Sequence, residues 1–374
     1  MKLLVDCHCF DYPTPQGINT YIKGLYTSLV PIAKDVDFYF AANDTNNLKL
    51  IFGEYRNVFY IKIPHCGSLS RLLGIFPTLI REYSIDWAHF QYVGPLFKAC
   101  KTIVTLHDIL FLDFPKYFPL SYRISKGLMF RYAAKRADLL LTVSSYSKRQ
   151  ITQHYNIKAE NIFVTPNAIT DRFSLIKKED ANEFVRQKYG LEKYVLYVSR
   201  LEPRKDQFGL IKAFIESGVY KHGVSLVIVG EETIHDNRID EYLARLDETA
   251  KGRIIFLKGI LDYELANLYR GAALFVYPSK AEGFGIPPLE SAVSEITTIC
   301  NNQTAMKDFD FFGERLIDTS DTSKLADMIR ESLQKPLCCN ELSLLKKQVL
   351  EKYNWNNIAQ EFYKILTYQN LRNR

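Results

Sequence analysis

The first half of the chain alternates short apolar runs with stretches of helical pattern. Leu3–Val5, Val36–Phe40 and Thr102–Leu106 are predicted to be strands, and so are three further segments: Val58–Ile63, Leu139–Val143 and Ile162–Val164. After the first strand, apolar residues recur at the spacing of one helix face: Ile18, Tyr21, Ile22, Leu25 and Leu29. Helices are predicted between most of the strands, including one around Tyr122–Arg136.

The second half resumes this alternation after a polar stretch over residues 168–190, which is predicted to be a linker that runs into a helix. Four strands are predicted beyond it: Tyr194–Val198, Ser225–Val229, Ile254–Leu257 and Ala273–Tyr277. The helices predicted among them are Gln207–Phe214, Arg238–Ala250 and one near Tyr263–Arg270. The pattern continues through three more segments: Leu289–Ser294, Thr297–Cys300 and Ser323–Leu333.

Strands that alternate with helices predict parallel sheets with right-handed crossovers. Two such runs around a polar linker predict two doubly wound α/β domains, over residues 1–170 and 191–354, with the linker at 171–190. No repeat of about 20–50 residues is present, which argues against a solenoid. Ligands of such sheets bind beyond the carboxyl ends of the strands, so we expect the site in a cleft between the domains.

Composition adds that the chain has the balance of a soluble globular protein, with 47% hydrophobic and 24% charged residues among 374. Basic residues number 48 and acidic residues 42, and this net charge of +6 is too small to argue for nucleic acid. It is compatible with an anionic small molecule or an anionic lipid surface. No stretch approaches the ~18–20 apolar residues of a transmembrane helix, so any membrane contact is expected to be peripheral.

The seven cysteines are odd in number and include no C-x-x-C pair. In a chain of this length, such a set favours reduced thiols over a disulfide framework. The apolar run after Met1 reaches Asp6 too soon to be the core of a secretory signal. We therefore expect a cytoplasmic protein, with peripheral contact at the inner face of the membrane as a further expectation.

The segment richest in candidate chemistry runs from Tyr277 to Glu290 and reads Tyr-Pro-Ser-Lys-Ala-Glu-Gly-Phe-Gly-Ile-Pro-Pro-Leu-Glu. Gly283 and Gly285 lie in a loop between a predicted strand and a predicted helix. Glycines before a helix N-terminus let backbone N–H groups approach an anion, which the helix dipole favours. Glu282 could then lie near the sugar part of a ligand, while Glu290 could accept from ribose hydroxyls. A Gly-rich turn with two solvated glutamates is the alternative.

A basic turn, Ser199-Arg-Leu-Glu-Pro-Arg-Lys205, follows the first strand of the second half. Arg200 and Lys205 stand just past the carboxyl end of that strand, where cations can neutralise a diphosphate. Taken alone, a solvated basic turn is the simpler interpretation.

Two places in the first half could face a ligand. Gly17, in Pro15-Gln-Gly17, lies where a substrate or phosphate could approach the start of a helix, and a plain tight turn is the alternative. His107-Asp108 follows the strand Thr102–Leu106, at the end where cleft-facing side chains belong. There His107 could orient a hydroxyl or transfer a proton, or it could be structural.

Together these segments resemble a known family. The second half is similar to the donor domain of family 4 retaining glycosyltransferases of the GT-B architecture, over four stretches in the same order and spacing: Tyr194–Lys205, Leu226–Gly230, Leu265–Pro278 and Glu282–Glu290. In the first half, Leu106–Phe118 and Ala137–Ser144 resemble the branch rich in mannosyl- and rhamnosyltransferases. Residues 355–374 are similar to the family's C-terminal helix, which crosses back to the first domain, so the resemblance covers nearly the whole chain.

The resemblance implies a donor site in the second domain. Arg200 and Lys205 would hold the donor diphosphate and stabilise the departing nucleotide. Glu290 would bind the ribose, and Glu282 would contact the donor sugar near its anomeric carbon. Backbone N–H groups of the loop would cradle sugar and phosphate, and the residues concerned are Gly283, Phe284, Gly285 and Ile286.

On the acceptor side, the resemblance implies that Gly17, His107 and Asp108 line the site. The catalytic set would then be Glu282, Arg200, Lys205 and His107. The nucleotide-sugar is the co-substrate, and no cofactor or metal is expected, since the cations would neutralise the phosphate charge.

Other patterns carry less signal. Asp308-Phe-Asp310 matches the D-x-D metal pattern of the other large glycosyltransferase architecture, but we place it after all the strands of the second half. Gly283-x-Gly285 lacks the third glycine of a dinucleotide fingerprint and does not follow a first strand, which disfavours a dehydrogenase. The sequence holds no His/Cys cluster with zinc spacing, no G-x-S-x-G elbow and no Walker loop.

The activity implied is a hexosyltransferase that moves a hexose from a nucleotide-sugar to a growing glycan. The first half favours GDP-mannose as donor and a bacterial surface polysaccharide on a lipid carrier, such as O-antigen or capsule, as acceptor. Some residues depart from the family: Glu295 and Thr297 replace the usual Gly and Pro, Ala305-Met306 replace Pro-Glu, and Asn19 replaces a second Gly. The altered segment at Glu295 motivates an alternative, a non-catalytic nucleotide-sugar-binding or scaffold subunit of a glycan assembly complex. A GT-B sugar epimerase is a third interpretation.

A basic segment in the first half could lie on anionic lipid. Tyr122–Arg136 carries basic residues among apolar ones: Arg123, Lys126, Arg131, Lys135 and Arg136 with Ile124, Leu128, Met129 and Phe130. A helix that packs on its own sheet and solvates its basic face is the alternative.

Overall fold

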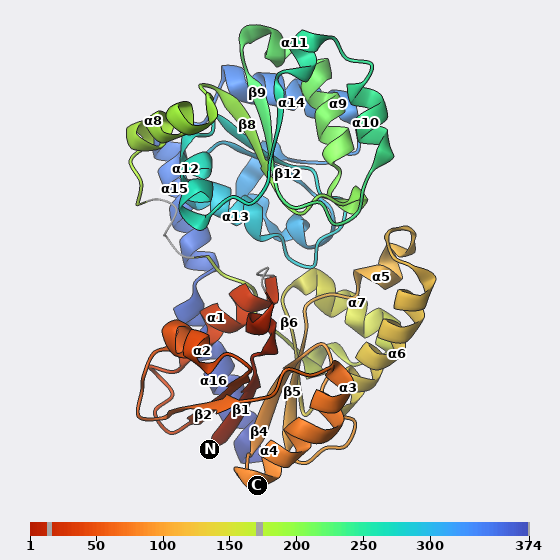
Figure 1. The fold of residues 1–374 in the computed structure, drawn as a ribbon, viewed down its shortest axis with the longest axis vertical. Helices are drawn as coiled ribbons and strands as arrows, with labels where there is room; N and C mark the ends of the chain where they lie inside the picture. The colour runs from red at the N-terminus through yellow and green to blue at the C-terminus, as the bar shows by residue number, and fades with distance from the viewer. Residues whose placement is uncertain (13–16, 170–174, 373–374) are drawn as a thin grey trace. The chain divides into compact units, whose positions relative to one another are not determined.

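The computed structural model describes residues 1–12, 17–169 and 175–372. It divides the chain into two compact units (Figure 1). The first unit is Met1–Ala168 together with Tyr353–Arg374, and the second is Ile169–Lys352. Each unit is a parallel sheet flanked by helices, so the predicted doubly wound α/β class is confirmed.

The first unit's sheet has seven described strands in the order β3-β2-β1-β4-β5-β6-β7, and every pair is parallel. The order reverses between β1 and β4, which makes the carboxyl ends of these strands the place where such a sheet opens a crevice. The strands are β1 (Lys2–Asp6), β2 (Asp37–Ala42), β3 (Val58–Lys62), β4 (Trp87–Gln91), β5 (Lys101–Leu106), β6 (Leu139–Thr142) and β7 (Ile162–Val164).

The strand β4 was not predicted from the sequence. Its residues read Trp-Ala-His-Phe-Gln, a mixture of polar and apolar types without a continuous apolar run. All five are buried nonetheless, because β4 pairs with β1 on one side and β5 on the other. Tertiary hydrogen bonds to His89 and Gln91 make this burial possible, and the sequence pattern does not show them.

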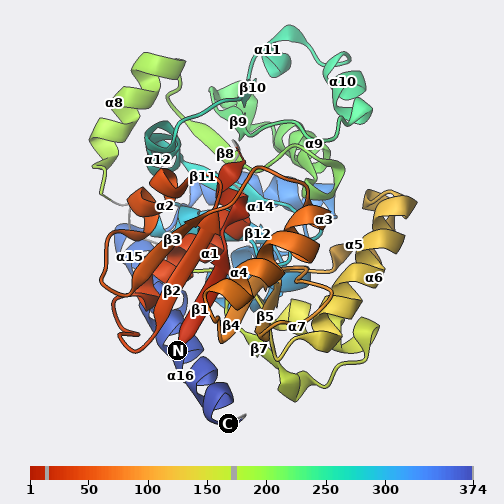
Figure 2. The ribbon, with the colours of Figure 1, turned by 60° about the horizontal axis from the view of Figure 1, so that its bottom comes forward.

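The first unit's helices include α16, the last helix of the chain (Figures 1 and 2). It packs against α1, where Gly24 has no side chain and the Trp355 ring takes the space; a Cβ at Gly24 would lie 2.0 Å from that ring. The helices are α1 (Gly17–Leu29), α2 (Thr45–Phe52), α3 (Ser68–Ser70), α4 (Phe76–Glu82), α5 (Leu110–Asp113), α6 (Leu120–Arg136), α7 (Ser145–Tyr155) and α16 (Trp355–Arg372).

The second unit's sheet has six described strands in the order β10-β9-β8-β11-β12-β13, again all parallel. They are β8 (Tyr194–Val198), β9 (Ser225–Val229), β10 (Ile254–Leu257), β11 (Leu274–Tyr277), β12 (Thr298–Asn301) and β13 (Leu316–Ile317). The two-residue strand β13 comes after Asp308–Asp310, so the expectation that this pair follows all the strands was wrong. A strand so short leaves no apolar run to recognise.

Two predicted segments of the second unit look different in the structure. Residues 238–250 form two helices rather than one, because the Asp247 side chain accepts the N–H of Ala250 and starts a new turn. Within the predicted linker 171–190, residues 178–189 are the helix α8, which packs on α12 and buries Ala181 and Val185. The helix is therefore part of the second unit, and residues 171–174 lie outside the described part.

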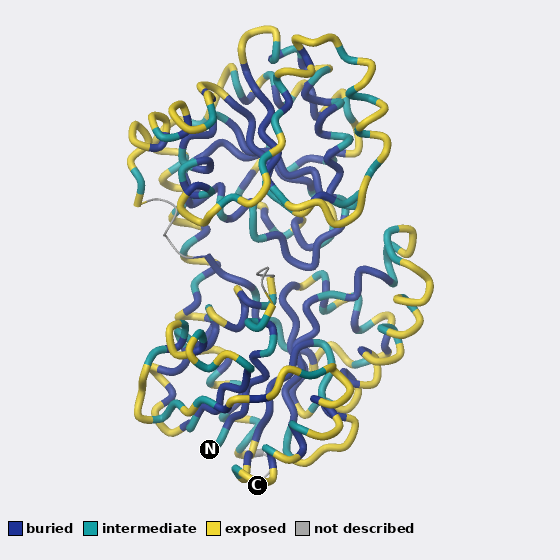
Figure 3. Tube along the Cα trace, viewed as in Figure 1, coloured by how far each residue is buried: buried dark blue, intermediate teal, exposed yellow. Residues whose placement is uncertain are grey.

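The helices of the second unit are α8 (Lys178–Tyr189), α9 (Gln207–Ser217), α10 (Asn237–Leu243), α11 (Glu248–Lys251), α12 (Asp262–Gly271), α13 (Ile286–Val293), α14 (Thr322–Gln334) and α15 (Cys339–Lys352). Figure 3 shows a buried interior in each unit, with exposed residues over the helices and turns. The central strands are buried on both faces, as parallel sheets require.

Candidate active site

Two segments with candidate residues leave the second sheet side by side. β8 and β11 are neighbours in space, and the strand order reverses between them. Arg200 and Lys205 follow β8, and Glu282 follows β11. The two segments are joined by a backbone hydrogen bond from the N–H of Lys280 to the carbonyl of Arg204, at 2.9 Å. The candidate residues therefore gather at the point where a doubly wound sheet opens a crevice.

At the centre of this point lies a buried ion pair. Lys205 Nζ donates to Glu282 Oε1 at 2.5 Å, and both side chains are more than nine-tenths buried. The Tyr277 hydroxyl donates to the same oxygen at 2.7 Å. Arg204 donates to the Ala281 carbonyl at 2.6 Å and lies 3.5 Å from Glu282 Oε2. We call these four side chains, Lys205, Glu282, Tyr277 and Arg204, the Glu282 cluster.

The charges of the cluster perturb its two central groups in the same direction for different reasons. Burial opposes ionisation of Glu282, but the charges of Lys205 and Arg204 outweigh it and lower the pKa of the carboxyl to about 2. For Lys205, burial dominates and lowers the pKa of the ammonium, while Glu282 opposes that shift. Glu282 is thus an anion throughout the neutral range, with hydrogen bonds aimed at its oxygens.

The turn that carries Lys205 is held back against its own strand. The 3-10 turn η6 (Pro203–Lys205) ends at Asp206, whose φ is 57°. Gln207, at the start of α9, donates to the Tyr197 hydroxyl at 3.0 Å and to the Arg200 carbonyl at 2.9 Å. These bonds tie the turn to β8 and fix where Lys205 points.

The glycine loop before α13 is close-packed. Gly285 has a φ of 102°, which favours glycine, and a Cβ there would lie 3.1 Å from Met306 Cγ. The Glu282 N–H donates to Thr304 Oγ1 at 3.0 Å, which ties the loop to the same neighbouring turn. Ala305-Met306, one of the departures from the family pattern, therefore packs directly on this loop. α13 begins at Ile286, with prolines in its first turn.

Two other predicted donor residues lie outside the Glu282 cluster. The Arg200 side chain is 55% exposed and lies 3.9 Å from Glu202. Glu290, one residue past the middle of α13, accepts from the Tyr269 hydroxyl at 2.9 Å. Neither forms a direct contact with Glu282 in the interactions shown above, so the six-residue prediction separates into a buried core and two flanking side chains.

The departure at Glu295 has a clear structural basis. Its φ is 55°, in the left-handed region that glycine adopts without strain. The carboxylate accepts from Arg270 at 2.8 Å and from Ser343 at 3.1 Å, and these contacts hold the side chain in place. Thr297, at the usual Pro position, accepts the N–H of Leu337 at 3.1 Å. Both departures are accommodated by local bonds away from the Glu282 cluster.

In the first unit, His107 follows β5 and is buried. Its Nε2 lies 2.7 Å from Gln91 Oε1, and burial lowers the pKa of the imidazole to about 3. Asp108 accepts the N–H of Leu110 at 3.2 Å. Gly17 starts α1 and is exposed, and a Cβ there would touch nothing, so space does not require glycine at this position. Pro15 and Gln16 lie outside the described residues.

Sequence reasoning did not single out several side chains of these sites. Arg204 and Tyr277 stand inside quoted motifs, next to assigned residues, but adjacent positions in a turn give no period that shows which side chains point inward. Gln91 and His89 lie on the unpredicted strand β4. A buried strand that contains His and Gln is the signal that could have pointed to them.

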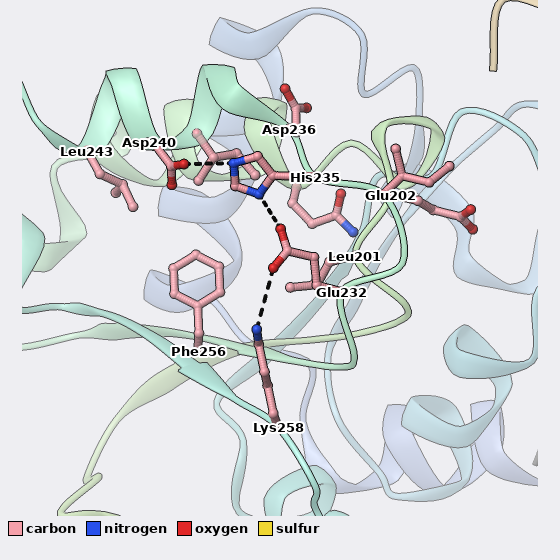
Figure 4. Close-up of a pocket in the computed structure, with 12 residues that line it drawn as sticks. Leu201, Glu202, Glu232, His235, Asp236, Asp240, Leu243, Phe256 and Lys258 are labelled. Carbon is pink, nitrogen blue, oxygen red and sulfur yellow. Dashed lines mark hydrogen bonds and ion pairs between the residues drawn. The ribbon is translucent and has the colours of Figure 1, made fainter. Parts of the chain in front are cut away.

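A pocket of about 190 Å³ lies beside the basic turn (Figure 4). Its floor is apolar, with Ile239, Leu243 and Phe256, and its rim includes Glu202 and Gln207. On the rim His235 binds Glu232 and lies 2.9 Å from Asp240, while Lys258 lies 3.5 Å from Glu232. The pocket adjoins the segment Arg200–Lys205, and Lys205, Glu282 and Glu290 are not among its lining residues.

The D-x-D pair is bound by a lysine. Lys352 Nζ donates to the Asp308 carbonyl at 2.9 Å and to the Asp310 carboxylate at 3.2 Å. Within residues 1–12, 17–169 and 175–372, no group of three or more His, Cys, Asp or Glu side chains is arranged to hold a metal ion. In the same residues, no helix has the length and apolar character needed to cross a membrane.

Two family models match consecutive parts of the chain. The one described as "Glycosyl transferases group 1" matches residues 178–348, and the one described as "Glycosyltransferase Family 4" matches residues 15–173. Among known proteins, the O-antigen chain mannosyltransferase B of Escherichia coli is 26% identical over 396 aligned residues, which span 98% of this chain and 100% of that protein. The O-antigen chain mannosyltransferase RfbU of Salmonella typhimurium is 27% identical over 259 residues, 69% of this chain and 67% of that protein.

Solved structures show the same fold. HepE of Anabaena, in complex with UDP and glucose, superposes with a TM-score of 0.73 at 17% identity, over 98% of this chain and 100% of that one. WaaG, a glycosyltransferase involved in lipopolysaccharide biosynthesis, gives a TM-score of 0.71 at 15% identity, with 98% and 100% coverage. The two parallel-sheet units and these comparisons define a glycosyltransferase of the GT-B architecture. Within that class, the chain belongs to the family 4 glycosyltransferases, as the resemblance of its motifs indicated.

Proposed function

We propose that this glycosyltransferase moves a hexose from a nucleotide-sugar held by the second unit to a glycan acceptor held by the first. The relatives named as O-antigen mannosyltransferases support mannose, carried by GDP, as the sugar, and a bacterial O-antigen as the product. Retention of anomeric configuration follows from family membership as an expectation. The scaffold and epimerase alternatives have no observation in their favour beyond the departures, which lie away from the Glu282 cluster.

The observation that carries the proposal is the Glu282 cluster at the switch point of the second sheet. A buried carboxylate next to a glycine loop and a helix N-terminus provides one anion that can face a sugar and one region that attracts phosphate. Lys205 and Arg204 already surround this carboxylate. A diphosphate that approached them would add anionic charge next to two cations, which is the arrangement that stabilises a departing nucleotide.

Arg200 is the side chain best placed to meet a ligand that arrives from solvent. It is more exposed than any member of the Glu282 cluster, and its charge is only weakly engaged by Glu202 at 3.9 Å. We therefore assign Arg200 to the donor diphosphate, Lys205 to the diphosphate and the orientation of Glu282, and Glu290 to the ribose. His107, Asp108 and Gly17 are assigned to the acceptor side.

Because Arg200 is exposed, it offers a test that stability does not confuse. The protein is purified, and each sugar nucleotide (GDP-mannose, UDP-glucose, UDP-GlcNAc) is added with a mannose-terminated acceptor, while nucleotide release and glycan product are measured. We expect product with one donor. Arg200→Ala should lower kcat/KM for that donor at least tenfold at unchanged melting temperature, and the matched control Arg245→Ala, also exposed, should have no effect.

Full transfer by Arg200→Ala would remove the diphosphate assignment, and folded Glu282→Gln with full activity would remove the donor-sugar assignment. Failure of the unaltered protein to bind any nucleotide-sugar in a thermal-shift assay would bring the scaffold alternative forward. We also propose transfer without a metal ion. Product formation that stops in EDTA and returns with Mg²⁺ or Mn²⁺ would contradict this.

We propose in addition that α6 in the first unit contacts an anionic membrane. Leu120, Ile124 and Leu128 recur every four residues, which places them on one face of the helix, and they are 64%, 57% and 67% exposed. Residues 120–136 include five basic and no acidic residues. An exposed apolar stripe within an all-basic helix suits lipid headgroups better than water.

Vesicle co-sedimentation tests this contact. We expect binding to vesicles with anionic phosphatidylglycerol, less to neutral phosphatidylcholine, and a loss of binding in Ile124→Ser/Leu128→Ser. Leu50→Ser is the matched control, because Leu50 is 87% exposed on α2 of the same unit. Equal binding by all variants, or none by the unaltered protein, would contradict the contact. A cytoplasmic location remains a prediction that cell fractionation can check.

A further inference from the structure

Four side chains form a buried row of hydrogen bonds behind His107. His107 Nε2 lies 2.7 Å from Gln91 Oε1, and Gln91 Nε2 lies 3.1 Å from His89 Nε2. His89 Nδ1 in turn lies 2.6 Å from the Tyr26 hydroxyl. All four side chains are more than nine-tenths buried, and His89 and Tyr26 are completely so. The acceptor-side assignments above use only the first of them.

The geometry of the sheet explains why the row exists. His89 and Gln91 are two residues apart on β4, so their side chains point to the same face. β5 pairs with β4 in register, with Gln91 opposite Thr105, and this brings His107 next to Gln91 just past the strand end. Tyr26 reaches the inner end of the row from α1. The row therefore starts inside the core and ends at the carboxyl edge of the sheet.

A glutamine in such a row determines which ring nitrogens carry protons. Its amide oxygen only accepts and its amide nitrogen only donates. Facing Gln91 Oε1, His107 Nε2 must be the protonated nitrogen. Facing Gln91 Nε2, His89 Nε2 must be the bare one, and the Thr105 hydroxyl, a possible second donor, lies 2.7 Å from it. The proton of neutral His89 is then on Nδ1, which donates to Tyr26.

The surroundings keep both rings neutral. Burial lowers the pKa of His107 to about 3, and burial together with the charge of His107 lowers the pKa of His89 to about 3. The rings that face His107 are Tyr21 at 5.1 Å and Tyr92 at 5.3 Å, and burial raises the pKa of Tyr21 to about 12. No carboxylate or cation contacts the His107 ring among the described residues. A neutral imidazole has one donor and one acceptor, so its tautomer decides what it offers.

We propose that Gln91 and His89 are positioning residues that hold His107 as the neutral Nε2–H tautomer, with Nδ1 as a hydrogen-bond acceptor for a hydroxyl of the glycan substrate. Among the residues that the structure describes, none is hydrogen-bonded to His107 Nδ1. A neutral Nδ1 selects a ligand group that donates, such as a sugar hydroxyl, over a carboxylate or phosphate oxygen. The tautomer stands by itself, and the role toward the acceptor rests on the proposed function.

The tautomer is measured directly in the full-length protein. Histidine is labelled with ¹⁵N, and long-range ¹H–¹⁵N correlation at pH 7 distinguishes Nε2–H, Nδ1–H and the imidazolium. The seven histidines include His107, which His107→Gln assigns by loss of its signals. We expect the Nε2–H pattern for His107 and the Nδ1–H pattern for His89. An Nδ1–H pattern or an imidazolium at His107 overturns the proposal, and this result needs no activity and no variant of Gln91.

Two substitutions at Gln91 separate positioning from packing. Gln91→Glu retains an acceptor for His107 Nε2–H but adds a negative charge, so the Nε2–H pattern should persist while the midpoint of His107 titration rises by at least one pH unit. Gln91→Leu removes the acceptor and should give mixed tautomers. Tryptophan fluorescence reports whether either variant is folded, since Trp87 and Trp355 both lie in the first unit. An unchanged His107 pattern in folded Gln91→Leu overturns the proposal.

Activity gives the second readout. By comparison with other residues that orient a functional histidine, Gln91→Leu should lower kcat by about 10–100-fold. The donor KM should change less than twofold, because the donor is assigned to the other unit. The control Gln187→Leu removes an exposed amide in the second unit and should leave kcat unchanged. If the unaltered protein transfers no sugar, the proposed function fails, while the ¹⁵N pattern still decides the tautomer.

Discussion

Removal of the Lys205 ammonium should destabilise the second unit, because it leaves the Glu282 carboxylate buried with weaker compensation. In Lys205→Met the carboxylate keeps the Tyr277 hydroxyl at 2.7 Å and Arg204 at 3.5 Å, but loses its closest cation. Loss of one partner from a buried ion pair typically costs about 3–5 kcal/mol of unfolding free energy. We expect the lower end of that range, because Arg204 remains.

The pKa of Glu282 gives an independent measure of the same interaction. Against the opposing effect of burial, Lys205 and Arg204 lower this pKa from 4.5 to about 2. A difference of that size corresponds to roughly 3 kcal/mol of favourable interaction with the charged form. Since two cations share it, Lys205 alone accounts for part, which agrees with the lower end of the mutational range.

A double-mutant cycle measures the coupling. Glu282→Leu should destabilise the second unit because it leaves Lys205 buried without its carboxylate. The double variant Lys205→Met/Glu282→Leu should recover most of the loss, since neither charge is then buried unpaired. Lys251→Met, on the exposed end of α11, is the control and should change the unfolding free energy by less than about 0.5 kcal/mol.

Urea unfolding followed by two probes locates the effect. Trp87 and Trp355 lie in the first unit, so tryptophan fluorescence follows that unit, while far-UV circular dichroism follows both. The substitutions should shift the dichroism transition. If the double variant were as destabilised as the sum of the single variants, the two side chains would not be coupled, and the account of the Glu282 cluster would be refuted.

Four further results are expected. The folded-state pKa of Glu282 lies below the unfolded value, so its contribution to stability is present above pH 4.5 and is lost as the pH falls toward about 2; acid titration by dichroism should show this loss, and Glu282→Gln should abolish it. Gly285→Ala should cost about 1–3 kcal/mol, measured by urea unfolding, because its φ of 102° and Met306 oppose a side chain. Gly24→Ala should destabilise the first unit by about 1–3 kcal/mol in the fluorescence transition, because the new Cβ would meet the Trp355 ring. Iodoacetamide followed by mass spectrometry should modify exposed Cys338 and Cys339 first, and buried Cys7 and Cys300 only on unfolding, since burial also raises the pKa of these two thiols.

Much of the architecture could be predicted because it depends on local pattern. Alternating apolar runs and helical stretches were enough for two doubly wound α/β units, since burial on both faces makes central parallel strands continuously apolar. The order of motifs along the chain was enough for the family, which the comparisons confirm. β4 escaped because its buried His89 and Gln91 are polar, and β13 because two residues make no pattern.

The sequence by itself therefore determined the class of fold, the family and the strand ends where candidate residues would lie. Only the tertiary structure decided which of these residues touch. Lys205 and Glu282 are 77 positions apart, and nothing local to either shows that their charges are buried together or that Arg204 and Tyr277 complete the group. The same holds for His107, whose proton position depends on Gln91 from a neighbouring strand. Hydrogen bonds and charge pairs act over a few ångströms, so their partners are set by the strand order that brings distant segments to one edge.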